Sequence, residues 1–309
     1  MDTKFEKTNL INDFKKNGFC GLGQLINDDD IIILRRKCKL MMSQQPYVES
    51  FKELKHGVFR KPVVKEKNWS VLSNFIGLSK EVDLILEKLV SSYEFKSIME
   101  GFFGKGYKTW AWSLRLSTTS DSGLGLHTDA KGESGVTILL DDIESSDGAT
   151  AVFPGSHKFP CSSQELMTDS FPIKLLKPFL VPITGKKGEV FLFSKKTYHG
   201  RLPNYSGKTK MVILMATFST GYSFDAVIPP ENVLDNLGPE MNRMMNQKGL
   251  KDIGGNLYKV INNGEKKPFI DTLYLLDKNR NIFWNLLKIY PLFIVRPVQW
   301  LKKSLRQNF

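Results

Sequence analysis

YKTWAWSLRLS, residues 107–117, begins the part of the chain that decides its fold. From this point apolar residues alternate with polar ones or form short apolar runs, with Gly, Asp and Ser between the runs, as in a series of short β-strands. The further strand-like segments are GLGLHTDA (123–130), SGVTILLDD (134–142), GATAVFP (148–154), GEVFLF (188–193) and KMVILMATF (210–218). Short strands at fairly even spacing predict a sandwich or a double-sheet barrel.

The chain before this point is mostly helical in pattern. Helices are predicted over residues 3–17 and 26–42, with a short strand, GFCGLGQL, between them. Residues 45–65 are expected to be irregular, and apolar residues at three-to-four spacing predict two or three helices over 70–103. Helices that precede the strands favour an α+β fold over a doubly wound parallel sheet.

The composition is typical of a soluble globular protein. The chain has 309 residues, 41% of them hydrophobic and 25% charged, which suits one large domain or two modest ones. Its three cysteines, Cys20, Cys38 and Cys161, lack Cys-x-x-Cys spacing and indicate neither a disulfide framework nor a thiolate zinc site. A reducing, cytoplasmic location is expected. The first residues, MDTKFEKTNL, lack the apolar segment of a secretory signal.

The net charge is +12, because 44 Lys and Arg residues outnumber 32 Asp and Glu residues. This excess favours an anionic partner. No zinc-finger spacing, RNP-type motif or basic recognition helix accompanies it, so no nucleic-acid partner is expected. An anionic substrate, a membrane surface and a solvated basic face remain as interpretations.

The last part of the chain, residues 226–309, is basic, apolar and helical in pattern. Its segment 281–303, NIFWNLLKIYPLFIVRPVQWLKK, is interrupted by charges and prolines too often to span a membrane. Aromatic residues beside basic ones fit peripheral contact with a membrane surface. Packing against the barrel, or at a dimer interface, is the favoured interpretation.

The tetrapeptide Leu-His-Thr-Asp, residues 126–129, carries a candidate metal site. Side chains two residues apart on a strand point to the same side, so His127 and Asp129 are expected on one face. One further histidine would complete the two-histidine, one-carboxylate set of non-heme Fe(II) oxygenases.

The other histidines of the chain are His56, His157 and His199. His56 lies in the irregular region and is most simply a surface residue. His157 lies in a Pro-Gly-Ser turn, which is expected to carry it away from the inner face of the preceding strand. His199 follows the apolar strand GEVFLF and is the favoured third ligand.

Several ordered motifs together resemble the phytanoyl-CoA dioxygenase family of Fe(II)/2-oxoglutarate oxygenases. Besides His127 and Asp129 they are FKKNGFCGL (14–22), SGVTILLDDIESSDGATAVFPGSHK (134–158) and GEVFLFSKKTYHGRLPNYSGKTK (188–210). The resemblance covers roughly residues 10–220. It implies a double-stranded β-helix, a cupin-like jelly-roll. We therefore expect one oxygenase domain over 1–225, with a helical part (1–105) and a jelly-roll (106–225), followed by the extension 226–309.

The resemblance also implies the site residues. Iron would be held by His127, Asp129 and His199. A basic residue eleven positions after the second histidine, commonly arginine in the family, would bind the far carboxylate of 2-oxoglutarate; here it is Lys210, which offers a point charge in place of a bidentate fork. Arg201, where the family often has a small hydroxyl residue, and Arg115 are further candidates for binding 2-oxoglutarate or a substrate anion. Outward-facing, solvated side chains are the alternative for both arginines.

The activity implied is that of a dioxygenase that uses dioxygen and 2-oxoglutarate to hydroxylate an unactivated carbon of a small, anionic or lipid-like molecule, giving succinate and CO2. Halogenating relatives lack the carboxylate ligand, so Asp129 favours hydroxylation, with desaturation or ring closure as variants. The alternatives are a non-catalytic jelly-roll binding protein and a cupin-type metal enzyme that does not use 2-oxoglutarate.

Overall fold

Two facing β-sheets form the centre of the computed structural model, which describes residues 3–48, 63–66, 69–119, 121–128, 133–158, 177–218 and 229–246. The larger sheet has the strand order β1-β10-β7-β12-β5-β4-β3-β2, and the smaller one has the order β6-β11-β8-β9. Within the described part, all strand pairs are antiparallel except β2 with β3. This arrangement confirms the jelly-roll and the α+β class.

The larger sheet consists of β1 (Phe19–Gln24), β2 (Tyr47–Val48), β3 (Val63–Glu66), β4 (Trp69–Ser73), β5 (Lys108–Ser117), β7 (Glu133–Leu139), β10 (Glu189–Ser194) and β12 (Lys210–Phe218). The smaller sheet consists of β6 (Leu124–His127), β8 (Thr150–Val152), β9 (Val181–Pro182) and β11 (His199–Arg201). The helices are α1 (Thr3–Asn17), α2 (Asp28–Gln44), α3 (Lys80–Ser91), α4 (Tyr93–Phe103), α6 (Glu231–Leu234) and α7 (Pro239–Met245), with short 3-10 turns η2 (Ser156–Lys158) and η3 (Lys177–Phe179).

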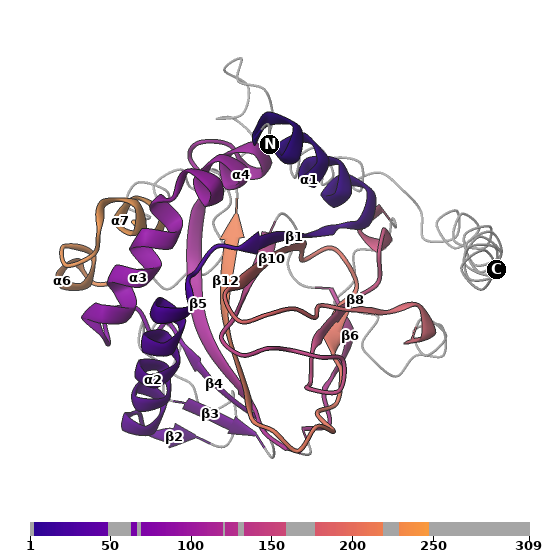
Figure 1. The fold of residues 1–309 in the computed structure, drawn as a ribbon. Helices are drawn as coiled ribbons and strands as arrows, with labels where there is room; N and C mark the ends of the chain where they lie inside the picture. Colours follow the sequence, from indigo (N-terminus) through magenta and orange to yellow (C-terminus); the bar gives the residue numbers. More distant parts are fainter. Residues whose placement is uncertain are drawn as a thin grey trace, which may run out of the picture.

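Alternation along the central strands gives the larger sheet two different faces. On β12, Met211, Ile213 and Met215 belong to the main core, which the helices cover, because side chains of a strand point alternately to opposite faces. Figure 1 shows the helices on one side of this sheet and β6 and β8 on the other. The opposite, inner face therefore points toward the smaller sheet.

Local sequence explains where the helices begin. Asn27 caps α2, and its side chain accepts a hydrogen bond from Asp30 N at 2.8 Å. Ser79 and Ser92 cap α3 and α4 in the same way. The buried residues of α3 recur at the spacing of one helical face: Val82, Ile85, Leu86, Leu89 and Val90.

Two sequence-based expectations are wrong in part. Residues 69–73, WSVLS, form β4 and not the start of a helix, because they pair along their length with β5 and bury Ser70 and Leu72. The region 45–65, expected to be irregular, contributes β2 and part of β3 to the sheet edge. Residues 49–62 lie outside the described residues.

The end of the described chain packs on the helical side. Backbone N–H groups of Glu240 and Met241, at the start of α7, donate to the Glu87 carboxylate of α3 at 3.0 and 2.8 Å. None of the described helices is long and apolar enough to cross a membrane. Residues 247–309, with the segment 281–303, lie outside the described residues, so the expected membrane or dimer contact stays a prediction.

Candidate metal centre

His127 and His199 lie directly opposite each other on two neighbouring strands. His127 ends β6, His199 begins β11, and the two residues are partners in the antiparallel register. Their ring centroids are 4.5 Å apart, with the ring planes inclined at 50°. Antiparallel pairing thus brings together two histidines that are far apart in sequence.

Both imidazoles have the same hydrogen-bonded orientation. Nδ1 of His127 lies 2.8 Å from the carbonyl oxygen of Gly125, and Nδ1 of His199 lies 2.8 Å from that of Thr197. A carbonyl oxygen can only accept, so each Nδ1 carries the proton and donates it, which leaves the lone pair of the neutral ring on Nε2. Histidine ligands of metals characteristically use this arrangement, because the second hydrogen bond fixes the tautomer and the ring.

Asp129, the predicted carboxylate ligand, lies outside the described residues. Within the described segments, no group of three His, Cys, Asp or Glu side chains is arranged to hold a metal ion. The histidine pair therefore represents the described part of the predicted ligand set, and the contribution of Asp129 stays a prediction.

His157 lies elsewhere. It belongs to η2, is fully buried, and its Nε2 is 3.1 Å from the carbonyl oxygen of Lys15 at the end of α1. Its ring also lies so close to Gly18 that a Cβ there would overlap Nδ1. The sequence-based expectation was that the Pro-Gly-Ser turn carries His157 away from the inner face of the preceding strand; in the structure its ring contacts α1 and Gly18, and its exclusion from the ligand set stays a prediction. His56 lies outside the described residues.

Apolar side chains line the far side of His199. The Phe193 ring of β10 lies against it, with centroids 4.9 Å apart, and Val152 of β8 is its register partner on the other side. Val152 and Phe193 are both buried and pack with Ile183. These contacts hold the imidazole in one orientation and keep water from that side of the ring.

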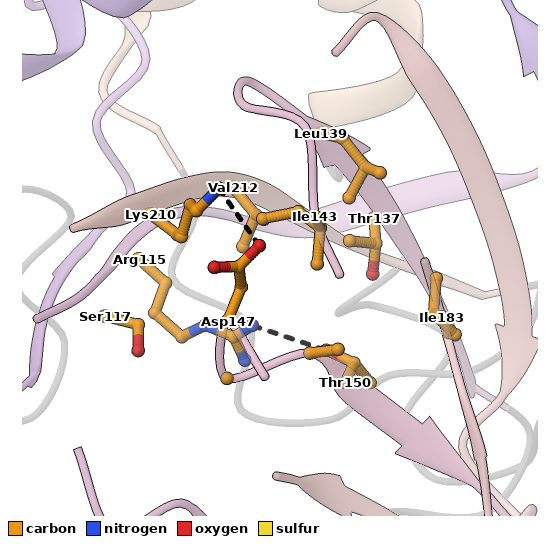
Figure 2. Close-up of a pocket in the computed structure, with 12 residues that line it drawn as sticks. Arg115, Ser117, Thr137, Leu139, Ile143, Asp147, Thr150, Ile183, Lys210 and Val212 are labelled. Atoms are coloured by element: carbon orange, nitrogen blue, oxygen red, sulfur yellow. Dashed lines mark hydrogen bonds and ion pairs between the residues drawn. The ribbon is translucent and has the colours of Figure 1, made fainter. Parts of the chain in front are cut away.

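A pocket lies between the two sheets, lined by residues of β5, β7 and β12 on one side and by Thr150 of β8 on the other (Figure 2). Thr150 of β8 lines this pocket, and Val152, two residues further along β8, is the register partner of His199. The pocket and the histidine pair are therefore separated by one two-residue step along β8. The remaining lining residues are Arg115, Ser117, Thr137, Leu139, Ile143, Asp147, Gly148, Ala149, Ile183, Lys210 and Val212.

Lys210 lines this pocket but has an acidic partner. Its Nζ lies 3.0 Å from Oδ2 of Asp147 and donates to the carbonyl oxygen of Asp142 at 2.6 Å, and the Lys210 side chain is only 13% exposed. Burial raises the pKa of Asp147, but hydrogen bonds from Ser206 and Glu144 N, and the charge of Lys210, bring it below its ordinary value. The Asp147 carboxylate is therefore ionised at neutral pH and lies against the Lys210 side chain.

Arg201 is also paired. Its Nη2 lies 2.9 Å from Oδ1 of Asp121, and the two side chains are 2% and 0% exposed. The guanidinium carbon stands 5.0 Å from the centroid of the Trp69 ring. The alternative of an outward-facing, solvated Arg201 is wrong, because β11 turns this side chain into the interior.

Arg115 faces the pocket from β5 without a carboxylate. Its Nη2 donates to the Thr150 hydroxyl at 3.3 Å (Figure 2), and among the described residues no acidic group lies within ion-pair distance of it. Burial, together with the charge of Arg201, lowers the pKa of Arg115 to about 9. The solvated alternative fails for this arginine as well.

The pocket also contains a polar atom that lacks a partner. The Thr137 hydroxyl is buried and has no hydrogen-bond partner among the described residues, an arrangement that costs free energy unless a ligand supplies the partner. Two imidazoles with Nε2 lone pairs, a guanidinium without a contacting carboxylate among the described residues, and a hydroxyl without a described partner fit a divalent metal and a carboxylate ligand. Sequence reasoning missed Thr137, although it is a polar residue within an apolar strand.

The two antiparallel sheets face each other with the histidine pair between them, and this arrangement is the double-stranded β-helix fold. Residues 120–212 match the family model described as Phytanoyl-CoA dioxygenase (PhyH). This stretch contains both histidines of the pair, Asp129 and Lys210, and the match confirms the resemblance noted from the sequence. The chain is accordingly an oxidoreductase of the 2-oxoglutarate-dependent oxygenase class, which uses Fe(II) and 2-oxoglutarate.

Solved structures share the fold. AviO1 from Streptomyces viridochromogenes Tue57 is 19% identical, with a TM-score of 0.51 over 71% of this chain and 97% of that chain. The epimerase SnoN in complex with Fe3+, alpha ketoglutarate and nogalamycin RO is 11% identical, with a TM-score of 0.57 over 72% and 88%. HygX from Streptomyces hygroscopicus with nickel, 2-oxoglutarate and hygromycin B bound is 13% identical, with a TM-score of 0.51 over 70% and 88%. No curated protein sequence matches the chain.

Proposed function

We propose that this oxygenase hydroxylates an unactivated carbon of a small, anionic or lipid-like molecule, and that His127, Asp129 and His199 hold its iron. The observation that carries the ligand proposal is the histidine pair, with both Nδ1 atoms bonded to carbonyl oxygens and the rings 4.5 Å apart. A carboxylate two residues after His127 completes the facial set, and with Asp129 in that position no halide takes its place.

The chain's own residues hold and shield the reacting groups. Bound iron supplies the activation of dioxygen, coupled to the conversion of 2-oxoglutarate into succinate and CO2. Gly125 and Thr197 orient the two imidazoles through their carbonyl oxygens, and Phe193 and Val152 keep water from one side of His199. The pocket beyond Thr150 is the place we assign to 2-oxoglutarate, with Arg115, Arg201 and Lys210 as its nearby cations.

The substrate class rests on charge. The net charge of +12 favours an anionic molecule, and the small molecules bound by HygX and SnoN, hygromycin B and nogalamycin RO, support a small-molecule substrate. We further propose that residues 1–225 form the oxygenase domain and that 226–309 extend it.

Adding 2-oxoglutarate to the iron-loaded full chain without oxygen tests the use of the cosubstrate. We expect a visible charge-transfer absorbance, and succinate once oxygen is admitted, from the wild type and from His157→Gln, and neither from His199→Ala. An iron-loaded wild type that gives no absorbance and no succinate would overturn the proposal in favour of a binding protein or a metal enzyme that does not use 2-oxoglutarate.

Mass analysis of products from a panel of anionic and lipid-like molecules then tests the reaction type. Hydroxylation adds one oxygen atom to the substrate, whereas desaturation and ring closure each remove two hydrogen atoms. A product that has only lost hydrogen would replace hydroxylation by one of these variants.

A further inference from the structure

We propose that Arg115 on β5, and not Lys210 on β12, binds the far carboxylate of 2-oxoglutarate. This inference rests on the proposed use of 2-oxoglutarate. The residue that binds the far carboxylate, called the anchor below, would then lie on β5 and not on β12, the strand that follows the second histidine.

The register of the larger sheet places the two cations at different depths. The Phe193 ring lies against His199, so the position of Phe193 on β10 gives the height of the histidine pair along the larger sheet. Phe193 pairs with Gly135 on β7, and Gly135 pairs with Ala216 on β12, so Ala216 lies at the same height. Val212, the register partner of Arg115, is two inward-facing positions away from Ala216 on β12. Lys210 is one further inward-facing position away, three in all from Ala216. Each such step is about 7 Å. Lys210 therefore begins farther from the metal site than Arg115.

The Arg115 side chain then reaches back toward the histidines. Its Nη2 lies 3.3 Å from the hydroxyl of Thr150, and Thr150 is one strand step from Val152, the register partner of His199. A step of about 7 Å along a strand is the scale that a five-carbon dicarboxylate bridges when its keto acid end is at the metal. The Arg115 guanidinium is therefore at a suitable distance from the metal site to bind the far carboxylate of 2-oxoglutarate.

Charge balance separates Arg115 from the other cations of the pocket. Lys210 is paired with Asp147 at 3.0 Å, so a carboxylate that approached it would meet the negative charge of Asp147. Arg201 is paired with Asp121 at 2.9 Å. Arg115 has a neutral hydroxyl partner and, among the described residues, no carboxylate within ion-pair distance; the charge of Asp121, which is bonded to Arg201, acts on it only from farther away, so an incoming anion meets a cation that no acid contacts directly.

Two further features favour this position. Burial and the charge of Arg201 lower the pKa of Arg115 to about 9, which means that the surrounding protein disfavours its cationic form and that an anion would restore the balance. The buried Thr137 hydroxyl, without a partner among the described residues, lines the same pocket (Figure 2). Its register partner Leu214 is one inward-facing position nearer the histidine level than Val212. A planar guanidinium with a neighbouring hydroxyl matches a carboxylate better than a lysine ammonium does.

The test measures equilibrium binding to the iron-loaded full chain without oxygen, by charge-transfer absorbance. Two probes are used: 2-oxoglutarate, and 2-oxobutyrate, which has the keto acid end but no far carboxylate. We expect Arg115→Gln to weaken 2-oxoglutarate about tenfold to a hundredfold, the range for a lost charged hydrogen bond, and to leave the affinity for 2-oxobutyrate unchanged. Thr137→Val is expected to lower the affinity for 2-oxoglutarate about threefold to tenfold.

The comparison variant is Lys210→Met/Asp147→Asn, which removes both charges of the second pair and so avoids a buried, unpaired acid. Because the inference gives Lys210 no part in binding the far carboxylate, this variant is expected to lose less 2-oxoglutarate affinity than Arg115→Gln does. The matched control is Lys208→Met, at an exposed position on the preceding turn, which should keep the affinity within about threefold. Arg115→Lys guards against misfolding of the glutamine variant and should recover part of the affinity.

Two results would overturn the inference. One is a loss of 2-oxoglutarate affinity in Lys210→Met/Asp147→Asn with none in Arg115→Gln, and the other is equal weakening of both probes by Arg115→Gln. Both leave the proposed function standing. An iron-loaded wild type that binds neither probe would overturn the proposed function together with the anchor.

Discussion

Arg201 and Asp121 join the two strands that carry the histidine pair. Asp121 precedes β6, which ends at His127, and Arg201 ends β11, which begins at His199; their side chains meet at 2.9 Å and are almost completely buried. Asp121 also accepts hydrogen bonds from Ser117 Oγ at 2.8 Å and Gly123 N at 2.9 Å. The carboxylate therefore fixes the loop before β6 against β5 and β11.

Asp121→Ala is expected to lower the free energy of unfolding by about 3–5 kcal/mol, because it leaves the Arg201 guanidinium buried without its counter-charge. Chemical denaturation measures this change. Asp121→Ala/Arg201→Met removes both charges and should recover part of the loss. A single variant that loses less than about 1 kcal/mol would mean that the pair is exposed enough to behave as a surface ion pair.

The second prediction concerns the close contact between the Phe193 ring and Gly135. Gly135 on β7 is the register partner of Phe193, and a Cβ at Gly135 would overlap the end of that ring. Gly135→Ala should push the ring from its place against His199, lowering stability by about 1–3 kcal/mol and weakening iron binding.

Gly21→Ala on β1 is the matched control for Gly135→Ala. Its added Cβ would come within 3.3 Å of the Phe191 ring, a tighter contact than usual but not an overlap. It is expected to cost under about 1 kcal/mol and to leave iron binding unchanged. Thermal unfolding and an iron titration of both variants make the comparison, and equal iron affinities in the two would remove Phe193 from the support of His199.

Sequence reasoning identified the long strands β5, β7, β10 and β12, which have enough residues for alternation, or a continuous apolar run, to stand out. It also identified β1, β6 and β8, because each lies within an apolar segment bounded by glycine. β9 and β11 have two and three residues, too few for any period, and they exist because neighbouring strands pair with them. β4 was missed because its short apolar alternation continues into true helical spacing after Ser79.

The site shows the same division between local and long-range information. His199 was favoured because an apolar strand precedes it, which is a local signal. The acids that neutralise the two flanking cations, Asp121 and Asp147, gave no local signal, because their contacts depend on how the sheets face each other. Pairing between distant segments therefore decided which arginine is left without an acidic partner.

The third prediction concerns the metal ligands. His127→Ala and His199→Ala should each abolish tight Fe(II) binding, because each removes one imidazole of the pair from the ligand set. The readout is the iron content after dialysis. His157→Gln keeps a donor near Lys15 and should retain most of the iron. Equal loss from His157→Gln and His199→Ala would move the ligand assignment away from β11.

The fourth prediction is a pH dependence of the contact between α7 and α4. Glu240 lies beside Arg243, with Oε1 2.6 Å from Arg243 Nη2, and beside Lys96 of α4, with Oε2 3.3 Å from its Nζ. Burial raises the pKa of Glu240, but the hydrogen bond and charge of Arg243, followed by those of Lys96, bring it below its ordinary value of 4.5. The ionised form is therefore favoured in the folded protein.

Because this pKa is lower in the folded than in the unfolded chain, the stabilisation is fully present above about pH 4.5 and is lost as the pH falls through the folded value. Glu240→Gln is expected to lower the free energy of unfolding by about 1–3 kcal/mol at neutral pH. Urea unfolding of both proteins from about pH 7 to about pH 3 should show this difference shrinking below pH 4.5, as the wild-type carboxylate takes up a proton. A difference that stays constant down to the lowest pH would show that the glutamine acts through packing and not through the lost charge.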